Sequence, residues 1–445
     1  MQETVKLSEY VAAFQFEAIP RPLVTEMKTL LLDYLGVTLR GSKTEAARIA
    51  AEYHRDAGAA RQEATIIGHG WKATAQAAGF ANAVAAHSIE LDDVDDLALF
   101  HFSPPVFSAA LAVAESRGAS GQEFLGAVTA GCEVMARISN ATNPVLRDRG
   151  FHTTPVCGVF GAAAAAAILE GLSTDQVASA FGIAGAHAGG LMEMYGPSMQ
   201  KRINPGPAAH NGVVAAGMAK RGYTGANTIL EGERGILNAF AGQSDPSALT
   251  RDLGSQIPVY VEYKPYASAR PIHNAIDCAL ALRPPLNGRL EAIENMTIWR
   301  HPSWAHYHQI SAPRTYHEAQ VSLNYSVAVA LLEGAAFFDQ YSEDRIRDPQ
   351  IRRLSKMLQF ETDPALPRGV SCRLKITLKG GRTLEHQVDY PKGSRHNPMT
   401  DEEHWVKFQA LAGSRLSANR MAEIRVLVDG LENLSDITKL AALLH

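Results

Sequence analysis

Residues 150–171 have the sequence GFHTTPVCGVFGAAAAAAILEG, and this stretch decides how the first half of the chain folds. A short polar segment containing His152 comes first, and a run of glycine and alanine follows it. Alanine is the best helix former and carries almost no side chain, so such a helix can lie very close to its neighbours. The stretch therefore predicts a buried helix at the centre of a helical domain.

On both sides of this stretch, apolar residues recur with the period of a helix. Pro104 and Pro105 suit the first turn of a helix, and Gly118 suits its end. The pattern predicts further helices at residues 22–38, 44–58, 73–89, 106–117, 122–141, 175–187 and 208–221. Apart from a short strand at 64–68, residues 1–255 show almost no strand period, which predicts an all-α domain.

The pattern changes near residue 256, where IPVYVEYKPY (257–266) is rich in β-branched and aromatic residues. Residues 372–379, CRLKITLK, alternate between apolar and polar, and Gly380-Gly381 then indicates a hairpin turn before a return strand. We expect residues 256–400 to form a smaller α+β domain. The helical period resumes in residues 401–445, so the tail is expected to return to the first domain. The predicted fold class is mainly α.

Composition excludes several functions. The chain has 445 residues, of which 46% are hydrophobic and 20% charged, and its net charge is −4 without a basic cluster, which argues against a nucleic-acid partner. The apolar run at 155–169 is too short and too rich in alanine to predict a membrane span, and the acidic start lacks a signal core. The four cysteines lie far apart, which favours free thiols in a reducing compartment: Cys132, Cys157, Cys278 and Cys372. We therefore expect a cytoplasmic protein with no membrane partner.

The most polar stretch is HSIELDDVDDLALFHFSPP, residues 87–105, which holds five carboxylates in residues 90–96 and a histidine on each side, His87 and His101. Buried carboxylates need partners, so the stretch is either a solvated loop or part of a site. It lacks the glycine and the terminal glutamate of a calcium loop, so no metal site is expected. Nucleotide-binding and serine-hydrolase motifs are absent from the sequence, and no cofactor is predicted.

Two polar segments lie just before small-residue helices. His152 is either an acid–base group or a histidine satisfied by nearby backbone. Lys201 lies in SMQKRINPGPAAHNG, before the helix predicted at 208–221. A helix N-terminus disfavours a cation, so Lys201 has an anionic partner or a lowered pKa, unless it is an ordinary surface lysine.

Further candidates lie in the second half of the chain. Lys264, Arg270 and His273 are close together in YKPYASARPIHNAID, where lysine and arginine could bind carboxylates. Tyr325 is a polar residue within an apolar helical segment. It is either a tyrosine at the edge of the core or a residue that takes part in chemistry.

Together these segments resemble the MmgE/PrpD family, which includes 2-methylcitrate dehydratase, cis-aconitate decarboxylase and iminodisuccinate epimerase. The resemblance covers nearly the whole chain and rests on the order and spacing of six motifs. They are H-x-[ILM]-[DE]-[LF]-D-D at 87–93, H-x-S at 101–103, GFHTTPVCGVFGAAAAAA at 150–167, K-x-x-x-x-G-x-A-A at 201–209, KPYASARPIHNAID at 264–277 and SLNYSVAVALLEG at 322–334.

The resemblance implies an all-α domain built from both chain ends, an inserted α+β lid domain, a homodimer, no organic cofactor and an active site in the cleft between the domains. The family's site residues fall on this set, with Asp93 adjacent: Glu90, His101, His152, Lys201, Lys264 and Tyr325. The sequence departs from the family pattern at Val94, where threonine is common, and at Asn204, where histidine is common. Phe102 replaces a proline, and Glu90 replaces the aspartate of the decarboxylase.

The family's shared chemistry is removal of a proton next to a carboxylate, followed by loss of water, loss of CO₂ or return of the proton. Histidine titrates near neutrality, so either His101 or His152 could be the base. The cations Lys201, Lys264 and Arg270 would hold the carboxylates of a small di- or tricarboxylate, and His273 is expected to help bind it. Tyr325 would donate a proton or fix a substrate oxygen, and Glu90 and Asp93 would orient a histidine.

We therefore predict a cofactor-independent lyase, with dehydration as the first choice. An epimerase or a decarboxylase of a similar acid, and a non-catalytic anion-binding protein, are the alternatives.

Overall fold

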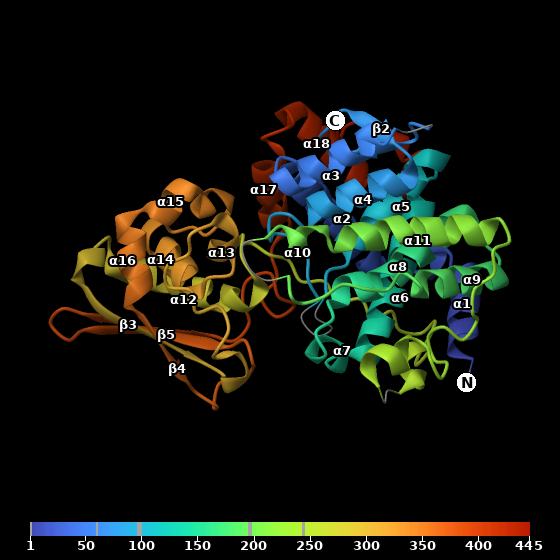
Figure 1. Cartoon of the computed structure of the whole chain (residues 1–445). Coiled ribbons are helices and arrows are strands. Elements are labelled where there is room, and N and C mark those ends of the chain that lie inside the picture. The colour runs from blue at the N-terminus through green and yellow to red at the C-terminus, as the bar shows by residue number, and fades with distance from the viewer. Residues whose placement is uncertain (1, 59–60, 96–99, 195–197, 243–244) are drawn as a thin grey trace. The chain divides into compact units, whose positions relative to one another are not determined.

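The computed structural model describes residues 2–58, 61–95, 100–194, 198–242 and 245–445. The chain divides into two compact units, which are described separately. Unit 1 comprises residues 1–261 and 401–445, and unit 2 comprises residues 262–400 (Figure 1). Helices make up most of the regular structure, and the predicted mainly α fold class is confirmed.

Unit 1 is built around α8 (Thr153–Glu170), the helix predicted to be central. It packs against α5 (Ser103–Arg117), α6 (Gly121–Thr142), α9 (Thr174–Gly185) and α11 (Pro205–Lys220). A further helix, α4 (Ala75–Ala86), packs on both α5 and α11. Nearly every residue of α8 is buried, as its run of alanine predicts.

Glycines set the distance between these helices. A Cβ atom added to Gly212 of α11 would lie 2.5 Å from the Cβ of Ala162 in α8. A Cβ added to Gly161 of α8 would lie 2.7 Å from the carbonyl oxygen of Gly131 in α6. Both contacts are shorter than atoms tolerate, so the helices approach as closely as they do only because no side chain intervenes.

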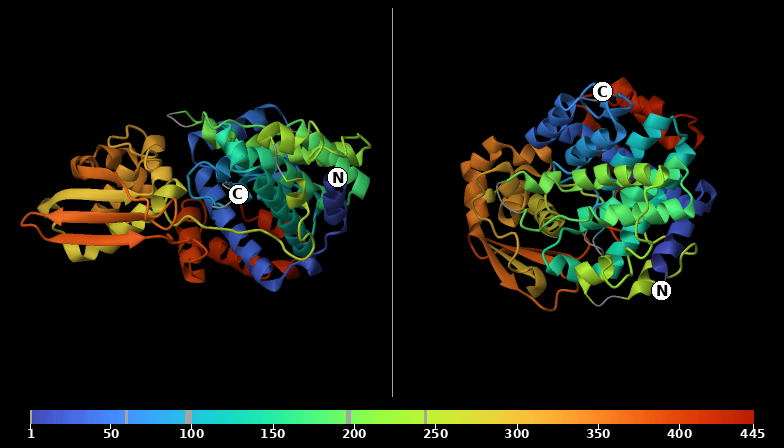
Figure 2. Two further views of the ribbon diagram at one scale, coloured as in Figure 1. Left: turned by 90° about the horizontal axis from the view of Figure 1, so that it is seen from below. Right: turned by 45° about the vertical axis from the view of Figure 1, so that its right-hand side comes forward.

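The C-terminal tail returns to the N-terminal helices of unit 1. Helix α17 (Asp401–Ala412) packs against α2 (Arg21–Gly41), and α18 (Ala418–Asp429) also contacts α2. Figure 2 shows this red tail beside the blue N-terminal segment in both views. The remaining elements of unit 1 are α1 (Glu3–Ala13), α3 (Glu45–Asp56), β1 (Ala64–Ile66), β2 (Trp71–Ala73), α7 (Val145–Asp148), α10 (Gln200–Ile203) and α19 (Thr438–Ala441).

Unit 2 contains a sheet with the strand order β4-β3-β5-β6. Strand β3 (Ile293–Arg300) pairs in parallel with β4 (Leu358–Thr362) and antiparallel with β5 (Cys372–Leu378), which pairs antiparallel with β6 (Thr383–Val388). Both glycines of the predicted Gly380-Gly381 turn have positive φ, and the hairpin is confirmed. Helix α12 (His273–Leu286) covers β5 and β6, and the other helices are α13 (Tyr316–Gln320), α14 (Leu323–Glu333), α15 (Glu343–Arg347) and α16 (Pro349–Met357).

Some expectations differ from the structure. Despite their β-branched and aromatic residues, residues 257–266 form no regular strand, and the backbone N–H of Tyr263 donates to the carbonyl of Gly393. Helix α5 begins at Ser103, earlier than predicted, because both prolines fit its first turn. By length and composition alone, α8 meets the criteria for a helix that could cross a membrane. However, 89% of it is buried within the protein, as in the core helix of a soluble domain.

Candidate active site

The N-terminal ends of three packed helices meet in unit 1. The backbone N–H of His101, just before α5, donates to the hydroxyl of Thr154 in the first turn of α8, 3.2 Å away. His152 is the N-cap of α8, and its Nδ1 lies 2.9 Å from Nδ2 of Asn204, the N-cap of α11. Each helix N-terminus carries a partial positive charge, so their meeting point favours an anionic ligand.

His101 is held at one ring nitrogen. Its Nδ1 lies 2.5 Å from the carbonyl oxygen of Asp93 and 3.2 Å from Oδ2 of Asp92. Two oxygen acceptors next to Nδ1 require a proton on that nitrogen, so the neutral ring carries its lone pair on Nε2. The side chain is 13% exposed, so this geometry provides a base that a small molecule can approach.

Asp92 joins His101 to a second, more deeply buried histidine. Its Oδ2 lies 2.7 Å from Nδ1 of His87, and the His87 and His101 rings are 4.9 Å apart. Burial lowers the pKa of His87, and the neighbouring Asp92 opposes that shift. Sequence reasoning assigned no role to His87 or Asp92, although both lie within the quoted 87–93 motif. The signal that could have found them was the pairing of a histidine and an aspartate at opposite ends of one short motif.

Asp93 does not orient a histidine through its carboxylate, which corrects the expected role. The carboxylate accepts backbone N–H groups from Phe102 at 2.7 Å and Ser103 at 3.1 Å, and it also accepts the Ser103 hydroxyl. It therefore caps the start of α5, and only its backbone carbonyl reaches His101. Burial raises the pKa of Asp93 to about 7, against the lowering effect of these hydrogen bonds.

Glu90 also differs from its expected role, because it pairs with cations rather than with a histidine. Lys201 Nζ contacts its Oε1, and Arg202 Nη1 lies 2.6 Å from the same oxygen. Arg202 also donates to the carbonyl of His87 at 3.3 Å. The φ angle of Glu90 is 56°, an uncommon value for a residue with a side chain, so tertiary contacts hold this position. Lys201 thus has the anionic partner that its position predicts.

The side chain of His152 is buried. Burial lowers its pKa well below the usual value, and the nearby His87, His101 and Lys201 lower it further. Its ring centre lies 6.0 Å from that of His87. The structure thus brings His101, His152, Lys201, Glu90 and Asp93 together in unit 1.

The other predicted residues lie in unit 2, where two of them have internal partners. Arg270 Nη2 lies 2.9 Å from Glu262 Oε2, and Nη1 lies 3.0 Å from the Lys392 carbonyl. His273 Nδ1 lies 3.1 Å from Arg270 Nη1, and its Nε2 lies 3.2 Å from the Ser268 carbonyl. Both side chains therefore tie segments of unit 2 together, and their expected contact with substrate stays a prediction.

Lys264 and Tyr325 are also buried in unit 2. The Tyr325 hydroxyl donates to the carbonyl of Gln340 at 2.6 Å, and burial raises its pKa. Ser322 caps α14, accepting the backbone N–H of Tyr325 at 3.0 Å. Within unit 2, Tyr325 is thus a core residue whose hydroxyl is satisfied by backbone.

Among the described residues, His87, Asp92 and His101 could hold a metal ion, because their ligand atoms lie within 4.8 Å of one another. The 2.7 Å between His87 Nδ1 and Asp92 Oδ2 is a hydrogen-bond distance. Two ligands of a tetrahedral ion with bonds of about 2.1 Å would be roughly 3.4 Å apart. The donor set would therefore fit an ion only after the two side chains separate.

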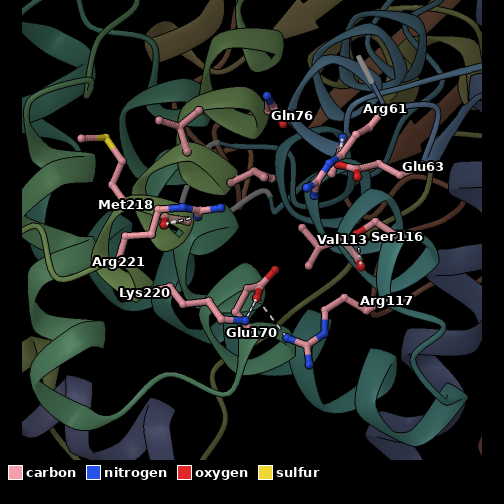
Figure 3. Close-up of a pocket in the computed structure, with 14 residues that line it drawn as sticks. Arg61, Glu63, Gln76, Val113, Ser116, Arg117, Glu170, Met218, Lys220 and Arg221 are labelled. Atoms are coloured by element: carbon pink, nitrogen blue, oxygen red, sulfur yellow. Dashed lines mark hydrogen bonds and ion pairs between the residues drawn. The ribbon is translucent and has the colours of Figure 1, made fainter. Parts of the chain in front are cut away.

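A cavity of about 800 Å³ lies at the other ends of the same helices (Figure 3). The C-terminal turns of α5, α8 and α11 contribute Arg117, Glu170 and Lys220 to its lining. Arg117 and Lys220 both contact Glu170, and none of the described residues that line the cavity is a histidine. Basic residues are favourable at helix C-termini, which accounts for their presence here without acid–base chemistry.

Comparison with known proteins shows similarity to one family over nearly the whole chain. The family models described as the MmgE/PrpD N-terminal domain and the MmgE/PrpD C-terminal domain match residues 5–249 and 266–433. A cis-aconitate decarboxylase-like protein of Aspergillus oryzae is 29% identical, covering 99% of this chain and 97% of its own. Human cis-aconitate decarboxylase is 29% identical over 95% of this chain and 90% of its own. A 2-methylcitrate dehydratase-like protein of Aspergillus oryzae is 34% identical over only 24% of each chain.

Proposed function

Since the chain belongs to the MmgE/PrpD family, we propose that it is a cofactor-independent enzyme that transfers a proton at a carbon next to a carboxylate of a small di- or tricarboxylic acid. One observation carries the proposal. His101 is fixed at Nδ1 by Asp92 and by the Asp93 carbonyl, which directs the lone pair to Nε2, and the ring is partly exposed.

His101 is the proton-transfer group in this proposal. A neutral imidazole accepts a proton from carbon at Nε2, and the imidazolium that results can return that proton. Asp92, 3.2 Å from Nδ1, would stabilise the imidazolium once it forms. This pairing of a histidine with a buried carboxylate is the arrangement that lets one group work first as a base and then as an acid.

The surroundings of His101 support a substrate with several carboxylates. Three helix N-termini meet at this point, and each favours negative charge. Lys201 and Arg202 both contact the carboxylate of Glu90, which places two cations at the site. A substrate carboxylate that contacts these cations would place its neighbouring carbon close to the acid–base groups.

The relatives that align over nearly the whole chain favour decarboxylation of a cis-aconitate-like tricarboxylate as the reaction. In that reaction CO₂ leaves, its bonding electron pair stays on the carbon skeleton, and protonated His101 supplies a proton to carbon. Dehydration, the first choice from the sequence, is the second candidate, because the dehydratase-like relative matches a quarter of the chain. There His101 takes the proton and hydroxide leaves.

Proton NMR in D₂O with a panel of aconitate-, citrate-, malate- and aspartate-type acids tests the proposal. Loss of CO₂ with one deuterium incorporated indicates a decarboxylase, and a new vinylic signal from a hydroxy acid indicates a dehydratase. Exchange without net product indicates an epimerase. Binding without exchange of any acid would replace the proposal with an anion-binding protein.

Two controls sharpen this experiment. The variant His101→Gln should lose turnover, whereas His69→Gln, at the turn between β1 and β2, should keep it. Dialysis against a chelator should leave turnover unchanged. If turnover were lost and a divalent ion restored it, the His87, Asp92 and His101 set would be a metal site instead.

A further inference from the structure

Asn204 contacts His152 through its amide nitrogen. The Nδ2 atom lies 2.9 Å from His152 Nδ1 and 3.0 Å from the thioether sulfur of Met194. A thioether sulfur can only accept a hydrogen bond, so the NH₂ group rather than the oxygen of the amide faces these two atoms. The Met194 contact thus fixes the orientation of the amide independently of the histidine.

This orientation determines where the proton of His152 resides. Because Asn204 donates to Nδ1, that nitrogen accepts, and the neutral ring must carry its proton on Nε2. The ring is neutral near pH 7, because burial lowers its pKa well below the usual value. Among the neighbouring groups in the described part of the chain, His87, His101 and Lys201 lower the pKa of His152 further, and Asp92 opposes them.

We propose that Asn204 is a positioning residue that holds His152 as the Nε2–H tautomer, so that His152 serves as a neutral hydrogen-bond donor to the substrate oxygen that gains negative charge. The inference rests on the proposed function and adds a division of roles to it. When a bond to the carbon beside a carboxylate breaks, charge moves onto the carboxylate oxygens, and a fixed N–H donor stabilises that charge. A neutral imidazole retains its proton throughout this role.

The two histidines thereby have opposite tautomers. His101 carries its proton on Nδ1 and its lone pair on Nε2. His152 carries its proton on Nε2 and its lone pair on Nδ1. A neutral His152 with a protonated Nε2 cannot act as a second base at that nitrogen. The arrangement therefore favours a lyase with one base over an epimerase in which His101 and His152 each remove a proton.

The identity of residue 204 matters because few side chains fix a tautomer in this way. A histidine, common at this place by family resemblance, can donate or accept and would leave the tautomer of His152 undetermined. An aspartate can only accept, so it would require a proton on Nδ1 of His152. The variant Asn204→Asp is therefore a nearly isosteric reversal of the hydrogen bond.

Neutron diffraction from crystals grown in D₂O near pD 7 reads the tautomer directly. We expect deuterium on Nε2 and none on Nδ1 of His152 in the wild type, and deuterium on Nδ1 in Asn204→Asp. The matched control is Asn211→Asp, the same exchange seven residues further along α11, where Asn211 contacts His210. It should leave His152 unchanged. A wild-type ring with deuterium on Nδ1 would overturn the inference, whatever the reaction.

Kinetics test the role of the tautomer. Removing one fixed donor to a developing anion typically lowers kcat by about 10²–10³-fold. We expect this loss in Asn204→Asp with a much smaller change in KM, and no such loss in Asn211→Asp. If Asn204→Asp reverses the tautomer but keeps wild-type kcat, the assigned role is wrong while the proposed function stands. If no acid is turned over, the proposed function fails, and the diffraction result still decides the tautomer.

Discussion

The shared carboxylate of Glu90 predicts which substitution at the site destabilises unit 1 most. Glu90, Lys201 and Arg202 have side chains that are only 2%, 12% and 4% exposed, and Arg202 Nη1 lies 2.6 Å from Glu90 Oε1. The change Glu90→Gln removes a negative charge that contacts two largely buried cations. Breaking a buried ion pair in this way costs about 3–5 kcal/mol, and we expect a loss of unfolding free energy of this size.

Two comparison variants isolate the charge effect. The change Lys201→Met removes one of the two cations and leaves Glu90 paired with Arg202, so it should cost clearly less than Glu90→Gln. The change Glu90→Asp keeps the charge on a shorter side chain and should fall between them. Urea denaturation followed by circular dichroism ranks the three variants, and hydrogen exchange in α10 and α11 shows whether the loss is local to this cluster.

The ranking is the critical result. If Glu90→Gln unfolded at the wild-type urea concentration, or if Lys201→Met were the more destabilising variant, Glu90 would not be neutralising the two cations. The inference that the cations of this cluster attract a substrate carboxylate would then lose its support as well.

Three further outcomes follow from individual contacts. Gly212→Ala should destabilise the protein by about 1–3 kcal/mol, because the added methyl group would meet the backbone of α8. Gly217→Ala on the same helix should be neutral or stabilising, because its methyl group would meet only the end of a flexible side chain. Thermal unfolding of the two variants tests this difference. Burial raises the pKa of Asp93 from 3.8 to about 7, so the folded protein keeps a proton that the unfolded chain releases. The retained proton stabilises the folded protein by on the order of 4 kcal/mol below about pH 4, and this stabilisation is lost as pH rises to about 7. In Asp93→Asn, the unfolding free energy should therefore change less with pH between about 4 and 7. Tyr325→Phe removes the hydrogen bond to the Gln340 carbonyl and should cost about 0.5–1.5 kcal/mol in urea denaturation without changing turnover, and a large loss of turnover at full stability would restore its catalytic role.

The helices of unit 1 were predictable because local sequence determines them. The alanine run of α8 favours a helix, and the prolines of α5 favour a first helical turn. The hairpin at Gly380-Gly381 follows from the alternation of apolar and polar residues and from the two glycines of the turn. The members of the site were also predictable as a group, because the motifs that contain His101, His152 and Lys201 are distinctive in residue type and spacing.

The partner of each site residue was not predictable, because it depends on how distant segments pack. The sequence gives adjacent Asp92 and Asp93 the same chemistry, yet one reaches two histidine rings and the other caps α5. Arg270 has the residue type expected for binding a carboxylate, and its carboxylate is Glu262 of the same unit. Residue type limits what a side chain can do, and only the tertiary structure decides which partner it meets.

The requirements of the fold and of the site coincide in the bundle formed by α5, α8 and α11. Glycines such as Gly212 allow the helices to approach closely, and this proximity places three helix N-termini at one point. At the opposite ends, Arg117 and Lys220 meet the C-terminal turns and share Glu170, so that end is already neutralised. At the N-terminal end, Lys201 and Arg202 both contact Glu90, and the carboxylate of Asp93 caps α5. The binding of a small polycarboxylate that we propose at the histidine end would therefore depend on the same close packing that stabilises the core of the bundle.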